Sequence, residues 1–196
     1  KEEVLRVAAL GGTCEDVLDI DAHAALLQWE ESSSNSFAQF GLLKQAFTLR
    51  RAASKLYSNE RLEWLGDACL KFLASEAARR AGPRLHPTRL RTAVEDVVRN
   101  SNLTQLAESL GLIKCIHRGN SNSQQISKNV LAGCLEALFA ALLVDRDDGL
   151  ATAGDFAERS GLFRPWDSWS SARDARAQCT GLNASATSSC TECVSN

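Results

Sequence analysis

The sequence predicts an all-α fold, and three observations support that class. Apolar residues recur at helical spacing in several successive segments, as they do in helices that bury one face. The alternation typical of half-buried strands is nearly absent. The segment Val130–Val144 is apolar nearly all round, which predicts a deeply buried central helix. With 196 residues, the chain is long enough for one well-buried domain and a tail.

The N-terminal part of the chain is predicted to precede this domain. Helix-compatible runs extend over Val4–Leu10 and Val17–Trp29, and residues 30–36 have the composition of a loop or linker. We therefore expect residues 1–36 to be an N-terminal extension and the domain to begin near Phe37.

The first half of the domain contains two predicted helices. Apolar spacing predicts one over Phe40–Leu49, and the arginine pair that follows suits a helix C-terminus. The second is expected over Asn59–Arg80, with Asn59 as its N-cap and Gly82-Pro83 as its stop.

Four further helices complete the predicted bundle. They are expected over Thr88–Asn100 with Thr88 as N-cap, Asn102–Gly111, Ser127–Asp145 and Ala151–Arg159. From residue 164 onward the composition shifts to small and polar residues. We therefore place the domain over residues 37–163 and a Cys- and Ser-rich tail over residues 164–196.

Overall composition limits the classes of function. The formal charge is −2, which is not the strong basic bias of a self-sufficient nucleic-acid binder, so any RNA contact must be local or supplied by a partner. No apolar run reaches the roughly 18 residues that a membrane span needs, and no membrane role is expected. The absence of methionine leads us to expect a processed product or a piece of a longer protein.

The seven cysteines indicate a reducing intracellular compartment. Four of them lie in apolar or helical contexts, as free buried cysteines do: Cys14, Cys69, Cys115 and Cys134. Cys190 and Cys193, with Cys179 upstream, indicate a zinc site only weakly, because a structural site needs four ligands and no histidine lies near. The compartment itself, mitochondrial or other, is not readable from the sequence.

Three acidic residues interrupt the apolar pattern of the predicted 59–80 helix. Glu60, Glu63 and Asp67 are spaced so that all three carboxylates lie on one helix face. Like charges repel in such a row, and a divalent cation held by oxygen ligands removes the repulsion. On the spacing alone, a solvated acidic stripe on a surface helix explains the row equally well.

A fourth acidic residue, Glu136, lies in the apolar central segment, where an unpaired charge is costly. Packing of this segment on the 59–80 helix would bring Glu136 to Glu63 and Asp67, in a cluster of oxygen ligands suited to Mg²⁺ or Mn²⁺. Water on such a metal becomes a nucleophile near neutral pH, and the metal shields a phosphate under attack.

This pair of segments resembles the catalytic domain of the ribonuclease III family. The match includes the family's hallmark run at Asn59–Leu70, a first conserved helix at Leu43–Thr48 and a last acidic motif at Leu131–Asp145. It covers about residues 40–150, and three motifs in the right order favour the metal site over the solvated stripe.

The resemblance implies the ribonuclease III helical bundle and a metal-dependent endoribonuclease. Such an enzyme cuts double-stranded RNA in RNA processing, as a homodimer or as a heterodimer with another ribonuclease III domain. It implies Glu63, Asp67 and Glu136 as ligands of Mg²⁺ or Mn²⁺, and Glu60 as an auxiliary catalytic acid. Trp64 stands where the family usually has an interface phenylalanine, so Trp64 and its neighbour Leu65 are assigned to the dimer interface; an unpaired Trp64 would also expose a large apolar surface.

Basic residues supply candidate RNA contacts. Arg84, Arg89 and Arg91 belong to the densest basic stretch and are assigned to an RNA backbone, although an ordinary charged helix end and loop explain them equally well. Lys128 matches a lysine that the family often carries at the start of its last motif, and it is assigned to a phosphate.

The chain departs from the family at Gly133, where an aspartate normally precedes the late glutamate by three residues. In one interpretation, the remaining carboxylates and added waters still hold Mg²⁺, which commonly keeps several waters. In the other, the domain is catalytically degenerate and serves as a structural, RNA-binding or heterodimerising subunit of a ribonucleoprotein, such as a mitochondrial ribosome or an RNA-editing complex. Retention of Glu60, Glu63 and Asp67 favours the enzyme, because each would be a liability without a metal.

Overall fold

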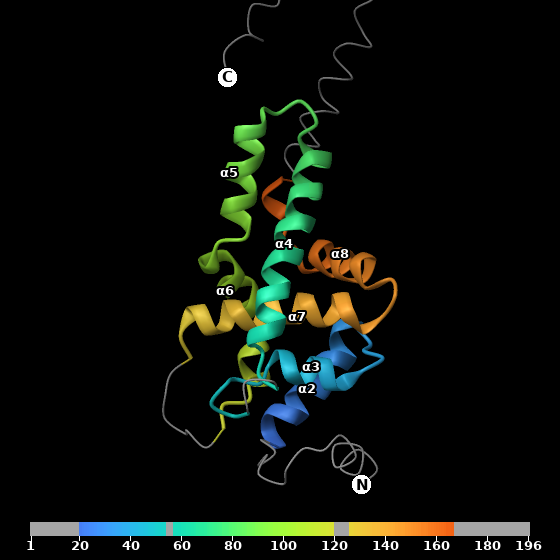
Figure 1. Ribbon diagram of the computed structural model, residues 1–196, viewed down its shortest axis with the longest axis vertical. Coiled ribbons are helices and arrows are strands. Elements are labelled where there is room, and N and C mark those ends of the chain that lie inside the picture. Colours follow the sequence, from blue (N-terminus) through green and yellow to red (C-terminus); the bar gives the residue numbers. More distant parts are fainter. Residues whose placement is uncertain (1–19, 54–56, 120–125, 167–196) are drawn as a thin grey trace, which may run out of the picture.

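The computed structural model describes residues 20–53, 57–119 and 126–166, which form a bundle of helices (Figure 1). The tail cysteines and Cys14 lie outside the described residues. The elements are α2 (Ile20–Ser33), α3 (Phe40–Ala46), α4 (Glu60–Ala81), α5 (Pro87–Val97), α6 (Asn100–Ser109), the 3₁₀ turn η1 (Leu112–Cys115), α7 (Lys128–Asp145), α8 (Gly149–Ser160) and the 3₁₀ turn η2 (Arg164–Trp166). Apart from an isolated bridge between Thr48 and His117, these residues contain no strand. The all-α prediction is confirmed.

Helix α7 forms the centre of the bundle, as its apolar composition predicts. It packs against α3, α4, α6 and α8, and α4 crosses it in Figure 1. Leu135, Leu138 and Phe139 are completely buried. The helix starts where Ser127 accepts a hydrogen bond from the Val130 N–H at 3.4 Å, which is an N-cap of the ordinary kind. Despite this apolar centre, no helix in the described part of the chain is long and apolar enough to cross a membrane.

The crossing of α4 and α7 depends on Gly66. A Cβ atom at this position would overlap the backbone carbonyl of Glu136, so only glycine lets the two backbones come this close. Gly66 lies between Glu63 and Asp67 in sequence. The same contact therefore carries both α4 carboxylates to the middle of α7.

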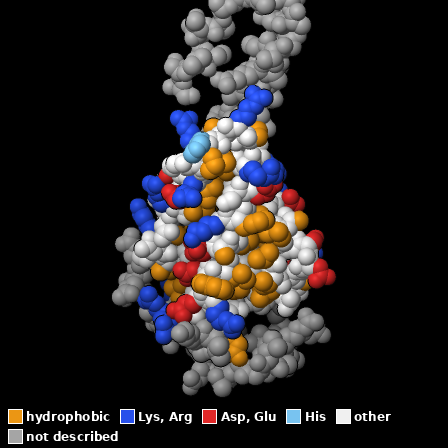
Figure 2. Space-filling view, turned by 45° about the horizontal axis from the view of Figure 1, so that its top comes forward, with side chains coloured by type: hydrophobic (Ala, Val, Ile, Leu, Met, Phe, Trp, Pro, Cys, Tyr) orange, Lys and Arg blue, Asp and Glu red, His pale blue; other side chains and the backbone are white. Residues whose placement is uncertain are grey.

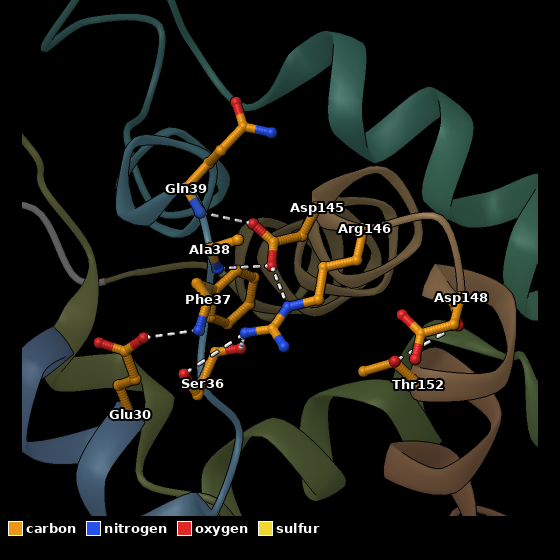
Figure 3. A network of polar contacts seen from close by, with 9 residues as sticks. All are labelled: Glu30, Ser36, Phe37, Ala38, Gln39, Asp145, Arg146, Asp148 and Thr152. Carbon is orange, nitrogen blue, oxygen red and sulfur yellow. Dashed lines mark hydrogen bonds and ion pairs between the residues drawn. The ribbon is translucent and has the colours of Figure 1, made fainter.

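The C-terminal end of α7 is fastened to the segment before α3 (Figure 3). The backbone N–H groups of Ala38 and Gln39 donate to the two carboxylate oxygens of Asp145, each at 2.7 Å. Arg146 donates to the same carboxylate at 3.2 Å and to the Ser36 carbonyl at 2.8 Å. Asp145 is only 8% exposed, so these donors replace the water that burial removes.

Helix α2 contributes to the same core. Leu26 and Trp29 are buried, and the Trp29 ring meets Phe156 edge to face at 6.1 Å. At the other end of the described chain, Trp166 is also buried in this core. The core thus includes residues on both sides of the 37–163 interval, and the domain boundaries themselves stay predictions.

Several helix ends differ from the predicted ones. Helix α3 stops at Ala46, before the predicted end at Leu49, because Phe47 and Leu49 exchange backbone hydrogen bonds with His117 instead. The arginine pair at 50–51 therefore lies beyond the helix and does not terminate it. Asn59 occupies the N-cap position of α4, as predicted, but it makes no capping hydrogen bond through its side chain, whose amide donates to Cys134 Sγ at 3.8 Å.

The start of α5 also corrects a prediction. His86, and not Thr88, is the N-cap, and its Nδ1 atom accepts from the Thr88 N–H at 3.3 Å. Pro87 occupies the first helical position, where its fixed φ suits a helix start and its missing N–H costs nothing.

Candidate active site

The four predicted acids lie around the crossing of α4 and α7. Glu60, Glu63 and Asp67 come from the start of α4, and Glu136 comes from the middle of α7. All four are neither fully buried nor fully exposed. Their carboxylates are therefore partly desolvated while remaining accessible from outside.

Glu136 has the most perturbed environment of the four. Burial, followed by the charges of Asp67 and Glu63, raises its pKa to about 7, against a smaller lowering effect from Lys71. Burial and the charge of Glu60 also raise the pKa of Glu63. The carboxylates on the two helices thus lie near enough to oppose one another's ionisation.

The outer acids form ion pairs with basic side chains, whereas the inner ones do not. Lys71 Nζ lies 2.7 Å from Asp67 Oδ2, and Arg50 Nη1 lies 3.4 Å from Glu60 Oε1. Across the described ranges, Glu63 and Glu136 have no hydrogen bond and no ion pair through their carboxylates. The centre of the site therefore holds two acids without a direct ion-pair partner in the described part of the chain.

Gly133 faces this centre directly. A Cβ atom at position 133 would lie 2.7 Å from Glu63 Cδ and 2.8 and 2.9 Å from its two carboxylate oxygens. The Glu63 carboxylate thus occupies the space into which a side chain at position 133 would begin. Because that carboxylate is the far end of a flexible side chain, a larger residue requires Glu63 to move without displacing backbone.

The chemical nature of these side chains, although not their spacing, suits a hard divalent cation. Glu63, Asp67 and Glu136 offer the oxygen ligands that Mg²⁺ and Mn²⁺ prefer. The pKa values of Glu63 and Glu136 are raised by burial and by neighbouring carboxylates, so their charged forms are disfavoured while no cation is near. Among the described residues, however, no three His, Cys, Asp or Glu side chains lie close enough together to hold an ion. Side-chain movement would have to bring these carboxylates together.

A cleft of about 640 Å³ opens beside the acids. Its lining comes from the α3–α4 connection and from the first turns of α4 and α7, and consists of Leu49, Arg50, Arg51, Asn59, Glu60, Glu63, Asn129 and Val130. Glu60 and Glu63 therefore face the cleft, whereas Asp67 and Glu136 are outside its lining. Arg50, Arg51 and Asn129 were not predicted as site residues. The two arginines matched the C-terminal end of a predicted helix, and no motif marked Asn129.

The predicted interface residues behave differently from each other. Trp64 is 79% exposed, while Leu65 is partly buried against the core. Phe72, two turns further along α4, is 55% exposed and was not predicted, although its spacing from Trp64 was a usable signal. Apolar side chains gather on the face shown in Figure 2, with charged side chains around them.

The predicted RNA-binding residues fall into two places. Arg84, Arg89 and Arg91 are exposed and belong to the α4–α5 turn and the start of α5, at the end of α4 remote from α7 (Figure 1). Lys128 is exposed at the first position of α7. The structure thus does not bring the arginines to the four acids, whereas Lys128 precedes the cleft residue Asn129.

Comparisons with known proteins give a consistent match. The family model described as the Ribonuclease III domain matches residues 60–147. Ribonuclease 3 of Pasteurella multocida is 39% identical over 114 residues, covering 57% of this chain and 50% of that protein. Ribonuclease 3 of Bradyrhizobium diazoefficiens is 33% identical over 147 residues, covering 71% of this chain and 57% of that protein. The chain spans about half the length of such curated relatives.

Solved structures agree with this match. The nuclease domain of ribonuclease III from Campylobacter jejuni superimposes with a TM-score of 0.63 and 26% identity, covering 71% of this chain and 94% of that one. A second structure of that nuclease domain, described for flexibility in a region involved in dimer formation, gives a TM-score of 0.62 and 27% identity. It covers 67% of this chain and 92% of that chain.

Proposed function

Because the chain belongs to the ribonuclease III family, we propose that it is a metal-dependent endoribonuclease that cleaves double-stranded RNA as a dimer during RNA processing. One observation carries this proposal. Glu63 and Asp67 of α4 lie near Glu136 of α7 at the helix crossing, where burial and then the charges of these two α4 acids raise the pKa of Glu136. Such a group of opposed carboxylates is typical of a functional site.

We assign Glu63, Asp67 and Glu136 as the residues that would hold Mg²⁺ or Mn²⁺. A bound ion would supply an activated water and would neutralise charge on the phosphate. With a pKa of about 7, Glu136 is partly protonated at neutral pH and would have to lose that proton to act as a ligand. Glu60 is kept beside the site by Arg50 and serves as the auxiliary acid.

Dimerisation is supported by the exposed face of α4. Trp64 and Phe72 present large apolar surfaces to solvent, which a partner would cover. The partner is a second copy or another ribonuclease III domain, with Leu65 at the edge of the contact. Dimer formation is also a subject of one of the Campylobacter jejuni nuclease-domain structures.

RNA contacts are proposed for the exposed cations. Within the described residues, Arg84, Arg89, Arg91 and Lys128 have no ion pair with an acidic side chain, so they are available to phosphates. Lys128 would contact RNA near the acids, and the three arginines would contact it at the far end of α4.

The test combines cleavage with metal binding. A long RNA duplex with Mg²⁺ or Mn²⁺ should be cut to short products by the wild-type protein, and Glu136→Gln should lower the rate by at least 100-fold, as expected for loss of a metal-site carboxylate. Mn²⁺ should also raise the melting temperature of the wild-type protein, because a ligand that binds only the folded state stabilises it. Glu136→Gln should reduce that rise. Equal inactivity of the two proteins, with no Mn²⁺ effect, would reject the enzyme.

Gly133 favours one alternative function. Since position 133 supplies no oxygen ligand, the domain would instead be a non-catalytic subunit that binds RNA or pairs with an active ribonuclease III domain in a ribonucleoprotein, such as a mitochondrial ribosome or an RNA-editing complex. Purification in stoichiometric complex with such a partner, without cleavage by this chain, would support the alternative. An active homodimer would eliminate it.

A further inference from the structure

The cleft beside the acids is lined by charges of both signs. Arg50 and Arg51 come from the connection before α4, whereas Glu60 and Glu63 come from α4 itself. An anion entering this cleft is attracted by the arginines and repelled by the carboxylates. The arginines therefore define where a phosphate can rest.

Arg50 can change partners at little cost. Its side chain is 65% exposed, and its single ion pair in the described structure joins Nη1 to Glu60 Oε1 at 3.4 Å. That distance exceeds the 2.7–2.9 Å that is usual for a charge-assisted hydrogen bond, and exposed ion pairs contribute little free energy. A guanidinium in this situation can turn to a phosphate, whose oxygens match its planar set of donors.

The rest of the lining adds donors and partial positive charge. Helices α4 and α7 both begin at the cleft, at Glu60 and Lys128, and the N-terminal ends of helices favour anions. Asn129 accepts from the Asn100 side chain through its Oδ1 atom at 3.4 Å, and within the described residues its amide N–H groups have no hydrogen-bond acceptor. These features support the arginines and do not define the site alone.

We propose that this cleft binds a phosphate of the RNA strand next to the one presented to the four acids, and that Arg50 is the positioning residue that holds it. The proposal rests on the proposed function, because it identifies the contact that places a duplex over Glu63. Glu60 pairs with Arg50 in the free protein and competes with the phosphate for it, so Glu60 weakens duplex binding.

Arg61 provides a matched control for Arg50. It is also an exposed arginine close to the start of α4, but it does not line the cleft. Binding of a short RNA duplex is measured over a series of salt concentrations, without divalent metal, for the wild-type protein, Arg50→Gln and Arg61→Gln.

Arg50→Gln should lower the affinity at low salt roughly 10-fold and reduce the slope of log K against log salt by about 0.9. Arg61→Gln should change the slope by less than half as much. Arg50→Lys should keep the wild-type slope but bind more weakly, because lysine retains the charge and loses the planar donors. Glu60→Gln should tighten binding, since it removes the competitor for Arg50. Thermal melting of each variant checks that it folds.

The outcomes separate this inference from the proposed function. Equal slopes for the wild-type protein and Arg50→Gln, or no duplex binding by the wild-type protein, would overturn the role of Arg50. Duplex binding that depends on Arg50, but without cleavage when Mg²⁺ is added, would support the phosphate site and reject the enzyme. Cleavage of the duplex, with binding that does not depend on Arg50, would support the enzyme and reject the phosphate site.

Discussion

Asp145 and Glu136 are acidic residues of the same buried helix, and they have opposite surroundings. Asp145 receives two backbone N–H groups at 2.7 Å and the Arg146 side chain. Glu136 has acids as neighbours and a pKa raised to about 7 by burial, Asp67 and Glu63. The first is an anion whose donors are built into the fold, whereas the second still needs a cation or a proton.

The difference teaches that burial alone does not make an acid functional. Removal of water penalises any carboxylate, and what replaces the water decides the outcome. Around Asp145 the replacement is complete, so the residue fastens α7 to the segment before α3. Around Glu136 no described group donates a hydrogen bond to the carboxylate, so its charged form is costly in the fold.

The largest expected effect is a loss of stability at the helix crossing, where a substitution would displace Glu136. Gly66→Ala places a Cβ against the Glu136 carbonyl, so the two helices must separate and the protein should lose more than about 3 kcal/mol of stability. Gly41→Ala in α3 is the control, because a Cβ there meets nothing within 4 Å and the change should be neutral or slightly stabilising. Urea unfolding measures both variants. Similar stabilities for Gly66→Ala and the wild-type protein would show that the helices do not touch at this point.

The second prediction compares the two acids by the same substitution. Asp145→Asn turns an amide group toward backbone donors and should cost about 2–4 kcal/mol, since buried N–H groups lose their acceptor. Glu136→Gln removes an unpaired charge and should leave stability at pH 8 unchanged or raised. Urea unfolding at pH 8 provides the measurement. Equal losses for the two variants would mean that their surroundings are not opposite.

The smallest effect is a pH dependence that belongs to Glu136. Its pKa is raised above the ordinary 4.5 to about 7, so between these values the folded state binds more protons than the unfolded state. Stability contributed by this group is therefore lost as pH rises from about 4.5 to 7. After allowance for solvent screening of a half-exposed group, the loss should be roughly 1 kcal/mol.

Thermal unfolding of the wild-type protein and Glu136→Gln at pH 5 and pH 8 checks this sign. The melting temperature of the variant should fall less between pH 5 and pH 8, because its amide does not titrate. Glu63 has a pKa raised in the same direction, so some of the slope should remain. A steeper fall in the variant would contradict the assignment to Glu136.

Local pattern was sufficient to predict the helices that carry the acids. The row of Glu60, Glu63 and Asp67 and the apolar surroundings of Glu136 depend on helical period, which is a property of neighbouring residues. Burial of α7 follows from the same pattern, because a helix without a polar face has to be covered on all sides.

The remaining features depend on contacts between distant segments. The partners of Asp145 are backbone groups, which look alike at every position of a sequence. Asn59 was expected to cap α4, but Cys134 on another helix takes its side chain. Arg50 matched a helix end by sequence, and only the early stop of α3 leaves it on the cleft wall. The close approach of the Glu63 carboxylate to Gly133 likewise depends on the angle at which α4 and α7 cross.

Gly66 and Gly133 lie at the same helix crossing but differ in how well they tolerate substitution. At position 66 the obstacle is backbone, so substitution is penalised whatever the protein does. At position 133 the obstacle is one movable carboxylate, so a side chain there requires only that Glu63 turn away. The chemistry of the site can therefore be altered at position 133 by a single substitution that leaves both helix backbones in place.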